Sequence, residues 1–131
     1  MHWLVDTNVV SEFARPRPDA GVVKWARGIE RVSISAVTVE EIAFGMSWKP
    51  DERIRTWLSR FLAEACDVIS VSQAIAEEAG VMRGTFRTAG ITRTQADMLI
   101  AATASVHGLT LVTRNVRDFA ACRIKVFNPF V

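Results

Sequence analysis

The chain has 131 residues, of which half are hydrophobic and 23% are charged, and its formal net charge is +2. This composition excludes a disordered chain and leaves enough length to bury a core. No apolar run approaches the roughly 20 residues of a membrane span, and Asp6 comes too early to leave room for a signal peptide. We therefore expect one cytoplasmic domain over residues 1–131.

The few cysteines and histidines argue against two kinds of site. Two cysteines, Cys66 and Cys122, lie far apart without ligand-like spacing, and we expect them to be buried thiols. With only two histidines, His2 and His107, a histidine-rich zinc site and a Ser-His-Asp triad are both disfavoured. Arginine supplies 13 of the 16 basic residues, which suits phosphate binding but is equally explained by codon usage in a GC-rich genome.

Short apolar strands alternate with helical patterns along the chain. The amphipathic helices are expected at 51–65, where Asp51 is placed to cap the start, and at 73–88, and an apolar core helix is expected at 96–104. This alternation predicts an α/β fold with a parallel sheet covered on both faces. The strands are expected at residues 2–5, 32–35, 67–71, 109–113 and 124–127.

Four acidic residues stand out because each is attached to an apolar element. Functional residues of parallel sheets gather at the carboxyl ends of the strands and at the helix starts that follow, so folding is expected to bring these acids together. Carboxylates gathered closely repel one another unless a cation lies between them, and Mg²⁺ or Mn²⁺ prefers oxygen ligands. Such ions serve phosphoryl and phosphodiester chemistry. The acids are Asp6, Glu41, Asp97 and Asp118.

Each acid also has a structural explanation. Asp6 is suited to cap a helix, Asp97 to lie in a first helical turn capped by Thr94, and Asp118 to lie in a turn. Periodicity does not choose between Glu40 and Glu41 as the inward-facing glutamate.

Hydroxyl and amide side chains near the acids are candidates to orient carboxylates or water. Two of them, Ser35 and Thr38, are equally explained by the start of a helix. Three arginines, Arg93, Arg114 and Arg117, could neutralise a phosphate or pair with the acids. The candidate supporting residues are Thr7, Asn8, Ser35, Thr38, Thr113 and Asn115.

Five segments that carry these residues, taken together, resemble the PIN-domain ribonucleases, and among them the VapC-type (FitB-like) toxins of bacterial toxin–antitoxin pairs. Any one of the segments is a weak signal, whereas all of them in order at these spacings are a specific one. The resemblance covers almost the whole chain and rests on LVDTNVVSE (4–12), SAVTVEEI (35–42), ADMLIAATA (96–104), LVTRNVRDF (111–119) and VFNP (126–129).

The resemblance implies a three-layer α/β/α sandwich with a mainly parallel sheet and cleavage of single-stranded or loop RNA that depends on Mg²⁺ or Mn²⁺. It implies that Asp6 and Asp97 are the principal metal ligands. The spacing Ser-x-x-Thr-x-x-Glu assigns the second acid to Glu41, which would bind metal or orient the attacking water. Some relatives carry the fourth acid at the position of Asn115, so here the resemblance assigns that role to Asp118.

The resemblance also implies partners: a homodimer, and a small cognate antitoxin (VapB/FitA-like) whose tail can place a basic side chain in the acidic pocket. We expect the antitoxin to contact the surface around residues 44–62, which contains Phe44, Met46, Trp48 and Trp57. Trp57 is better explained as a core residue of an amphipathic helix, whereas for Trp48 the two explanations are balanced.

Three other functions are alternatives: an aspartyl-phosphate phosphatase, a metal-binding interaction module and a nuclease that acts on DNA. An aspartyl-phosphate phosphatase needs a second aspartate two residues after Asp6, where this chain has Asn8. The remaining alternatives are a metal-binding interaction module of the same fold and a nuclease of related fold that acts on DNA, although the chain lacks a long basic arm.

Overall fold

A five-stranded parallel sheet forms the centre of the computed structural model, which describes residues 2–131. The strand order is β3-β2-β1-β4-β5, so the N-terminal strand lies in the middle and β3 and β5 form the edges. Leu4 of β1 pairs with Ser33 on one side and with Leu111 on the other. The strands are β1 (Trp3–Val5), β2 (Val32–Ser35), β3 (Cys66–Ile69), β4 (Thr110–Val112) and β5 (Val126–Phe127).

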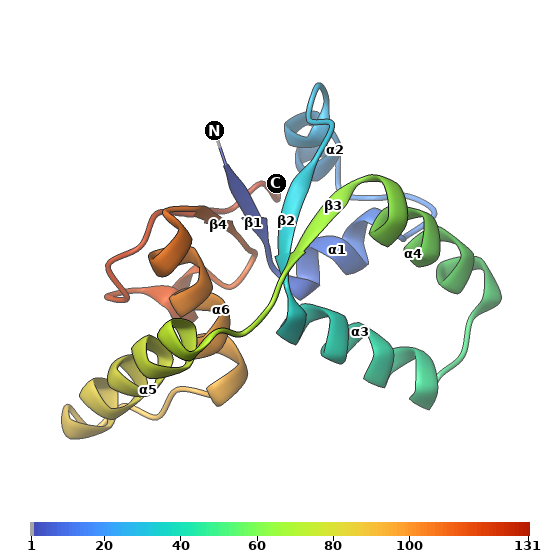
Figure 1. The fold of residues 1–131 in the computed structure, drawn as a ribbon. Coiled ribbons are helices and arrows are strands. Elements are labelled where there is room, and N and C mark those ends of the chain that lie inside the picture. The colour runs from blue at the N-terminus through green and yellow to red at the C-terminus, as the bar shows by residue number, and fades with distance from the viewer. Residues whose placement is uncertain (1) are drawn as a thin grey trace.

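Helices cover the sheet on both sides, as a parallel sheet buried on both faces requires (Figure 1). Two helices, α5 and α6, pack on one side, and the other helices gather on the opposite side and below the sheet (Figure 1). This confirms the expected α/β/α sandwich. The helices are α1 (Thr7–Phe13), α2 (Ala20–Ala26), α3 (Ala36–Trp48), α4 (Glu52–Glu64), α5 (Gln73–Thr88) and α6 (Gln95–His107), and a 3₁₀ turn, η1, spans Val116–Phe119.

Alternation along the central strands divides the core in two. Leu4 and Leu111 are fully buried in the cluster beneath α5 and α6, whereas their neighbours Val5 and Val112 are fully buried in the cluster on the opposite face. Successive side chains of a strand point to opposite faces, so β1 and β4 supply apolar residues to both layers. The middle of the sheet is therefore the most buried part, and it carries the candidate site at its carboxyl end.

The apolar helix expected at 96–104 is the core of α6. Thr94 caps its start by accepting a hydrogen bond from the Asp97 amide at 3.1 Å, and Gly108 ends it in the left-handed conformation at φ 64°. The helix is apolar around most of its surface because α5, the sheet and η1 enclose it. Asp97 lies in its first turn, where the sequence predicted a buried acid or a helix-start carboxylate.

The predicted elements are confirmed with small shifts at their ends. Helix 73–88 is observed with those bounds, and 51–65 becomes α4 with Asp51 accepting hydrogen bonds from the amides of Arg53 and Ile54. The strand expected at 67–71 begins one residue earlier and ends at Ile69. Beyond that point the chain leaves β2, its neighbour in the sheet of the described residues, and β2 itself ends at Ser35 opposite Ile69.

Both cysteines are buried free thiols, as expected. Burial raises the pKa of both thiols. Trp57 packs into the core and stacks on Phe61 at 5.0 Å between ring centroids, which confirms its core assignment. Among residues 2–131, no helix combines the length and the apolar character needed to cross a membrane.

Candidate active site

The predicted acids lie around the carboxyl ends of the central strands. Asp6 directly follows β1, and Glu41 lies in α3, the helix that follows β2. Asp97 lies in the first turn of α6, and Asp118 lies in η1, shortly after β4. The topology places these elements side by side because β1 is flanked by β2 and β4 in the sheet. Residues more than 100 positions apart in sequence are thereby brought to one edge.

Asp6 is held by more hydrogen bonds than any other acid in this region. Its side chain is buried, with the residue only 5% exposed. Oδ1 accepts a hydrogen bond from the Thr7 amide at 2.8 Å, and Oδ2 accepts from Asn8 Nδ2 at 3.0 Å and from Thr113 Oγ1 at 2.7 Å. Asp6 therefore caps α1, as its structural explanation predicted, and at the same time has a fixed orientation within the site.

Glu41, and not Glu40, is the glutamate that joins this network. Thr7 Oγ1 donates a hydrogen bond to Glu41 Oε1 at 2.6 Å and lies 3.1 Å from the hydroxyl oxygen of Thr38. Glu40 is exposed to solvent. The tertiary contact with Thr7 decides what helical periodicity left open.

The four acids are coupled through their charges. Burial is the main cause that raises the pKa of Asp6, and the nearby charge of Glu41 raises it further, against the hydrogen bonds from Thr113, Thr7 and Asn8. Burial likewise raises the pKa of Asp97, and the charges of Asp6 and Asp118 add to the effect. Thr94 and Arg93 act in the opposite direction on Asp97. Ionising all of the acids together is therefore unfavourable without a cation.

The donor set fits a hard divalent cation that keeps part of its water shell. Within residues 2–131, no three His, Cys, Asp or Glu side chains are grouped closely enough to enclose an ion by themselves. Mg²⁺ is commonly bound by one or two carboxylates together with water molecules, so a complete protein cage is not required. All the polar groups around Asp6 are oxygens or amides, whereas His107 ends α6, a full helix away from Asp97. Carboxylates with raised pKa values at this edge are the ligands that such an ion would stabilise.

The supporting residues divide into three groups: those that bond to Asp6, those that connect to Glu41, and those whose side chains contact neither acid. Thr113 and Asn8 belong to the site: besides their bonds to Asp6, Asn8 Oδ1 accepts a hydrogen bond from the Arg114 amide at 3.1 Å, and Thr113 Oγ1 accepts from the Asn115 amide at 3.0 Å. Thr7 and Thr38 connect to Glu41. Ser35 instead caps α3 by accepting a hydrogen bond from the Val37 amide, and Asn115 participates through its backbone.

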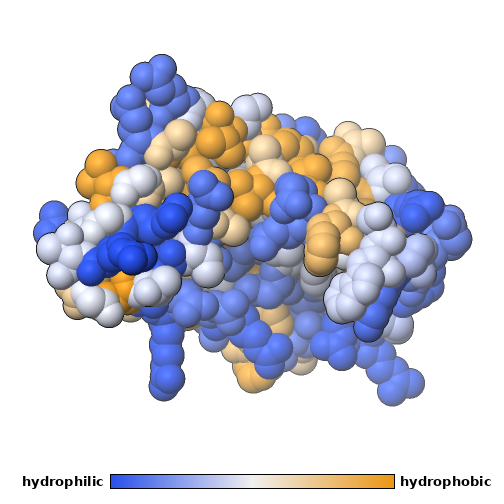
Figure 2. All heavy atoms as spheres, turned by 90° about the horizontal axis from the view of Figure 1, so that it is seen from below, coloured by the Kyte–Doolittle hydropathy of each residue, from blue (hydrophilic) through white to orange (hydrophobic). Residues whose placement is uncertain are grey.

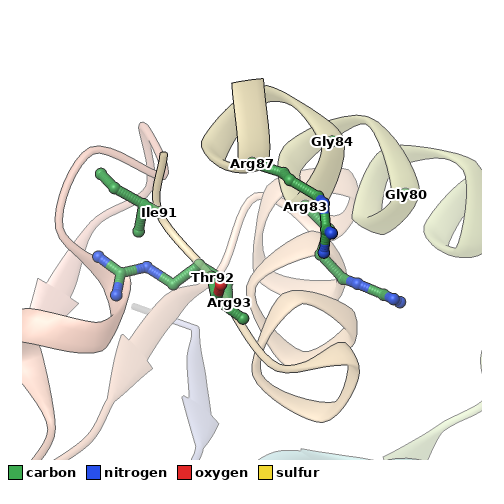
Figure 3. A pocket seen from close by; sticks show the side chains of 7 residues that line it. All are labelled: Gly80, Arg83, Gly84, Arg87, Ile91, Thr92 and Arg93. Atoms are coloured by element: carbon green, nitrogen blue, oxygen red, sulfur yellow. The ribbon is translucent and has the colours of Figure 1, made fainter. Parts of the chain in front are cut away.

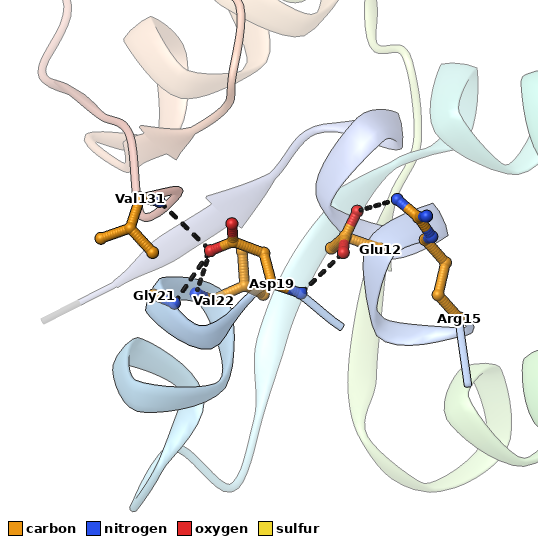
Figure 4. Close-up of polar contacts among 6 residues, drawn as sticks. All are labelled: Glu12, Arg15, Asp19, Gly21, Val22 and Val131. Atoms are coloured by element: carbon orange, nitrogen blue, oxygen red, sulfur yellow. Dashed lines mark hydrogen bonds and ion pairs between the residues drawn. The ribbon is translucent and has the colours of Figure 1, made fainter. Parts of the chain in front are cut away.

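A fifth acid, Glu12 of α1, is buried but bonds to groups outside the candidate site. Its carboxylate accepts hydrogen bonds from the Asp19 amide at 2.7 Å and from Arg15 Nη1 at 3.2 Å (Figure 4). Asp19 in turn accepts hydrogen bonds from the amides of Gly21, Val22 and Val131 (Figure 4). These contacts fix the loop between α1 and α2 and the C-terminal tail. The spacing of Glu12 and Arg15 is the sequence signal that could have indicated this structural ion pair.

The C-terminal tail also contacts the rim of the site. The guanidinium of Arg114 lies 4.7 Å from the ring centroid of Phe130, and Arg114 directly follows Thr113. The sequence suggested Arg114 as a partner for phosphate or for an acid. The structure stacks it on an aromatic ring of the tail.

Comparison with known proteins agrees with this geometry. The PIN domain family model matches residues 3–124. The chain is 34% identical to Toxin FitB of Neisseria gonorrhoeae over 97% of each chain. It is 33% identical to VapC ribonuclease Y4jK of Sinorhizobium fredii, covering 97% of this chain and 96% of the relative.

A solved structure, FitAcB from Neisseria gonorrhoeae, contains a chain of the same fold. The TM-score is 0.81 at 33% identity, and the alignment covers 97% of both chains. The chain therefore belongs to the PIN domain family, and within that family to the VapC/FitB toxins of toxin–antitoxin systems.

Proposed function

We propose that the chain is a metal-dependent endoribonuclease that hydrolyses phosphodiester bonds in cytoplasmic tRNA, rRNA or mRNA. The observation that carries the proposal is the coupling of Asp6, Glu41, Asp97 and Asp118 at one edge of the sheet. PIN-domain nucleases are metal-dependent hydrolases, and one relative is named a VapC ribonuclease. An acidic site that needs a cation is the arrangement such chemistry uses.

Asp6 and Asp97 would hold the ion, with Glu41 as a further ligand or as the group that orients water. A bound Mg²⁺ or Mn²⁺ would supply positive charge for the phosphate oxygens and a water of lowered pKa. Thr113 and Asn8 keep Asp6 oriented and favour its ionised form through their hydrogen bonds. Asp118 completes the acidic pocket through its charge.

The contact between Thr7 and Glu41 suggests how water is positioned. Oε1 of Glu41 already accepts the hydrogen bond from Thr7, which leaves Oε2 to accept one from the attacking water. Attack in line with the leaving 3′-oxygen would break the P–O3′ bond and transfer a proton to that oxygen. The products would be a 5′-phosphate and a 3′-hydroxyl.

A cognate antitoxin is the proposed regulator, and α3 and α4 are its proposed contact surface. Phe44 is 63% exposed and Trp48 68% exposed, with their rings 6.2 Å apart. A separate hollow of about 170 Å³ is lined by residues of α1, α3 and α4, among them Glu41, Met46 and Leu58. A chain bound there would reach Glu41 directly. This supports the expected surface at 44–62, apart from Trp57, which the core uses.

A homodimer is proposed from exposed apolar residues of the edge strand β3, of the segment that follows it and of α5. The exposed residues are Val68 in β3, Val71 in the segment between β3 and α5, and Val81 in α5, which is 65% exposed. The face seen from below carries a broad hydrophobic area bordered by hydrophilic residues (Figure 2). Large exposed apolar areas mark interaction surfaces. A second copy of the chain would cover such an area.

The test is cleavage of total RNA or tRNA by the purified, antitoxin-free protein with Mg²⁺ or Mn²⁺. Parallel reactions contain EDTA or the variant Asp97→Asn, and a further reaction contains single-stranded DNA. We expect RNA fragments only with metal and only from the wild-type protein. Cleavage that survives EDTA or Asp97→Asn contradicts the mechanism, and preferential cleavage of DNA contradicts the substrate class.

A further inference from the structure

A pocket with three arginines lies beside the acidic site, between α5 and the segment that leads into α6. Its volume is about 310 Å³, which lies in the range of roughly 300 to 1,000 Å³ found for small-molecule sites. The lining residues are Gly80, Arg83, Gly84, Arg87, Ile91, Thr92 and Arg93. Only Ile91 among them is a large apolar residue, so the pocket is not built like a peptide groove, whose core is rich in aromatic and apolar side chains.

One face of α5 supplies four of these residues. Positions 80, 83, 84 and 87 follow the spacing of a single helical stripe, and they place two arginines and two glycines on it. Arg83 and Arg87 lie together along this helix (Figure 3). Like charges one turn apart disfavour the helix, and within residues 2–131 neither arginine has a carboxylate within ion-pair distance. An anion in the pocket would relieve this repulsion.

The two glycines leave this face open. A Cβ atom at Gly80 or Gly84 would meet no atom within 4 Å, so core packing does not require glycine at either position. Glycine inside a helix costs stability relative to alanine, and one use that offsets this cost is the close approach of a ligand to the backbone. The stripe therefore combines open space with two cations that have no partner in the described chain.

Arg93 connects the pocket to the acids. It lines the pocket and extends away from Arg83 and Arg87 (Figure 3), with its guanidinium carbon 4.9 Å from the ring centroid of Phe86. Its Nε is buried and has no hydrogen-bond partner among residues 2–131. Arg93 also lies close enough to Asp97 for its charge to act on that carboxylate. A polyanion that reaches Asp97 would thus pass next to the pocket.

We propose that this pocket binds a backbone phosphate of the RNA, outside the scissile bond, with Arg83 and Arg87 as the anchoring cations. The proposal rests on the nuclease function proposed above. The guanidinium group binds phosphate through two parallel hydrogen bonds, and such contacts position a nucleic acid without selecting its sequence. The pocket would fix the direction in which the strand crosses the acidic site.

The experiment compares two double variants by steady-state cleavage of a labelled RNA that the wild-type protein cuts. Arg83→Gln/Arg87→Gln removes the pocket cations, and Arg27→Gln/Lys125→Gln removes two exposed cations that precede β2 and β5, at the opposite end of the sheet. We expect KM to rise about tenfold for each pocket arginine with kcat unchanged. The slope of log affinity against log salt should fall by about 0.7 for each phosphate that the protein no longer neutralises. The control variant should keep the wild-type values.

A second variant distinguishes the removal of a phosphate-binding group from a failure to fold. Gly84→Gln adds a better helix former whose side chain enters the hollow, so we expect a melting temperature no lower than wild type together with a raised KM. Unchanged KM in both Gly84→Gln and Arg83→Gln/Arg87→Gln would overturn the proposal. So would an effect of these variants on antitoxin binding or dimerisation without an effect on RNA.

An RNA-binding measurement on a protein that does not cleave separates the role of the pocket from the nuclease function. Fluorescence anisotropy of labelled RNA on Asp97→Asn protein, without metal, measures binding alone. Loss of RNA binding on adding Arg83→Gln/Arg87→Gln supports the pocket even if the wild-type protein cuts no RNA. Cleavage by the wild-type protein with no effect of the pocket substitutions supports the nuclease function and contradicts the pocket.

Discussion

Thr113 Oγ1 donates a 2.7 Å hydrogen bond to Oδ2 of Asp6, joining residues that are 107 positions apart in the chain. Thr113 follows β4 and Asp6 follows β1, and the two strands are neighbours in the sheet. Both side chains are buried, so this bond offsets part of the cost of keeping a carboxylate in the interior. It is also the hydrogen bond that contributes most to lowering the pKa of Asp6 against the effect of burial.

We predict that Thr113→Val weakens metal binding by about 10- to 100-fold and lowers stability by about 1.5 to 3 kcal/mol. Without the Thr113 hydrogen bond the pKa of Asp6 rises further, so the acid limb of the pH–rate profile should move to higher pH. Thr103→Val is the matched control because Thr103 is equally buried and donates only to the Leu99 carbonyl. A pH profile that is unchanged in Thr113→Val, or shifted equally in both variants, would count against this role.

Asp97→Asn should abolish cleavage and, without metal, make the folded chain more stable at neutral pH. Burial and the charges of Asp6 and Asp118 raise the pKa of Asp97 above its ordinary value of 3.8. The folded state therefore binds the carboxyl proton of Asp97 more tightly than the unfolded state does. Stability from Asp97 is fully present below pH 3.8 and is lost as pH rises through the raised pKa.

The measurement is the melting temperature of wild type and Asp97→Asn against pH, with EDTA and with Mg²⁺. In EDTA the advantage of Asp97→Asn should be greatest at neutral pH and should vanish near pH 3.8. Added Mg²⁺ should raise the melting temperature of the wild-type protein more than that of the variant. If the wild-type protein is the more stable of the two in EDTA at neutral pH, burial and the charges of Asp6 and Asp118 do not destabilise ionised Asp97.

Phe44→Ser/Trp48→Ser should weaken antitoxin binding while leaving RNA cleavage intact. Both side chains are more than 60% exposed, so their removal should cost the isolated chain little stability. Aromatic residues at the centre of an interface commonly contribute 2 kcal/mol or more, which corresponds to at least about 30-fold in affinity. Calorimetric titration with the antitoxin is the measurement. Val106→Ser on α6 removes another exposed apolar side chain and serves as the control; an equal loss of affinity there would argue against a specific α3 surface.

Gly21→Ala should destabilise the chain by about 1 to 3 kcal/mol through overpacking. A Cβ at Gly21 would lie 2.3 Å from the Pro129 carbonyl oxygen, which is a backbone atom with no easy way to move. The same substitution at Gly45, in the last turn of α3, meets no atom within 4 Å and should stabilise by about 0.4 to 1 kcal/mol. Urea unfolding of the two variants tests the difference. Equal effects would show that the tail does not pack on α2 in solution.

The sequence by itself determined the class of the fold and most of its elements. Apolar periodicity and caps such as Asp51 and Thr94 are local signals. They predicted α5 with its observed bounds and α4 within one residue at each end, whereas α6 extends three residues beyond the expected run 96–104. No bounds were predicted for α1, α2 and α3. The acids Asp6 and Asp97 were also visible locally, because a lone carboxylate next to a buried run is unfavourable without compensation. The strand ends were less accurate because a strand ends where its neighbour does, as β3 shows beside β2.

Only the tertiary structure decided which polar groups meet. Glu40 and Glu41 are adjacent in sequence, and the contact of Glu41 with Thr7 across 34 residues distinguishes them. Ser35 ends β2 and Thr113 follows β4, yet Ser35 caps the helix that comes next and Thr113 bonds to Asp6. Arg83 and Arg87 drew no attention in the sequence, because a helical arginine gives no local sign of the pocket that it lines. Local periodicity fixes which face of an element is apolar, whereas the order of strands in the sheet fixes which distant side chains come within hydrogen-bond distance.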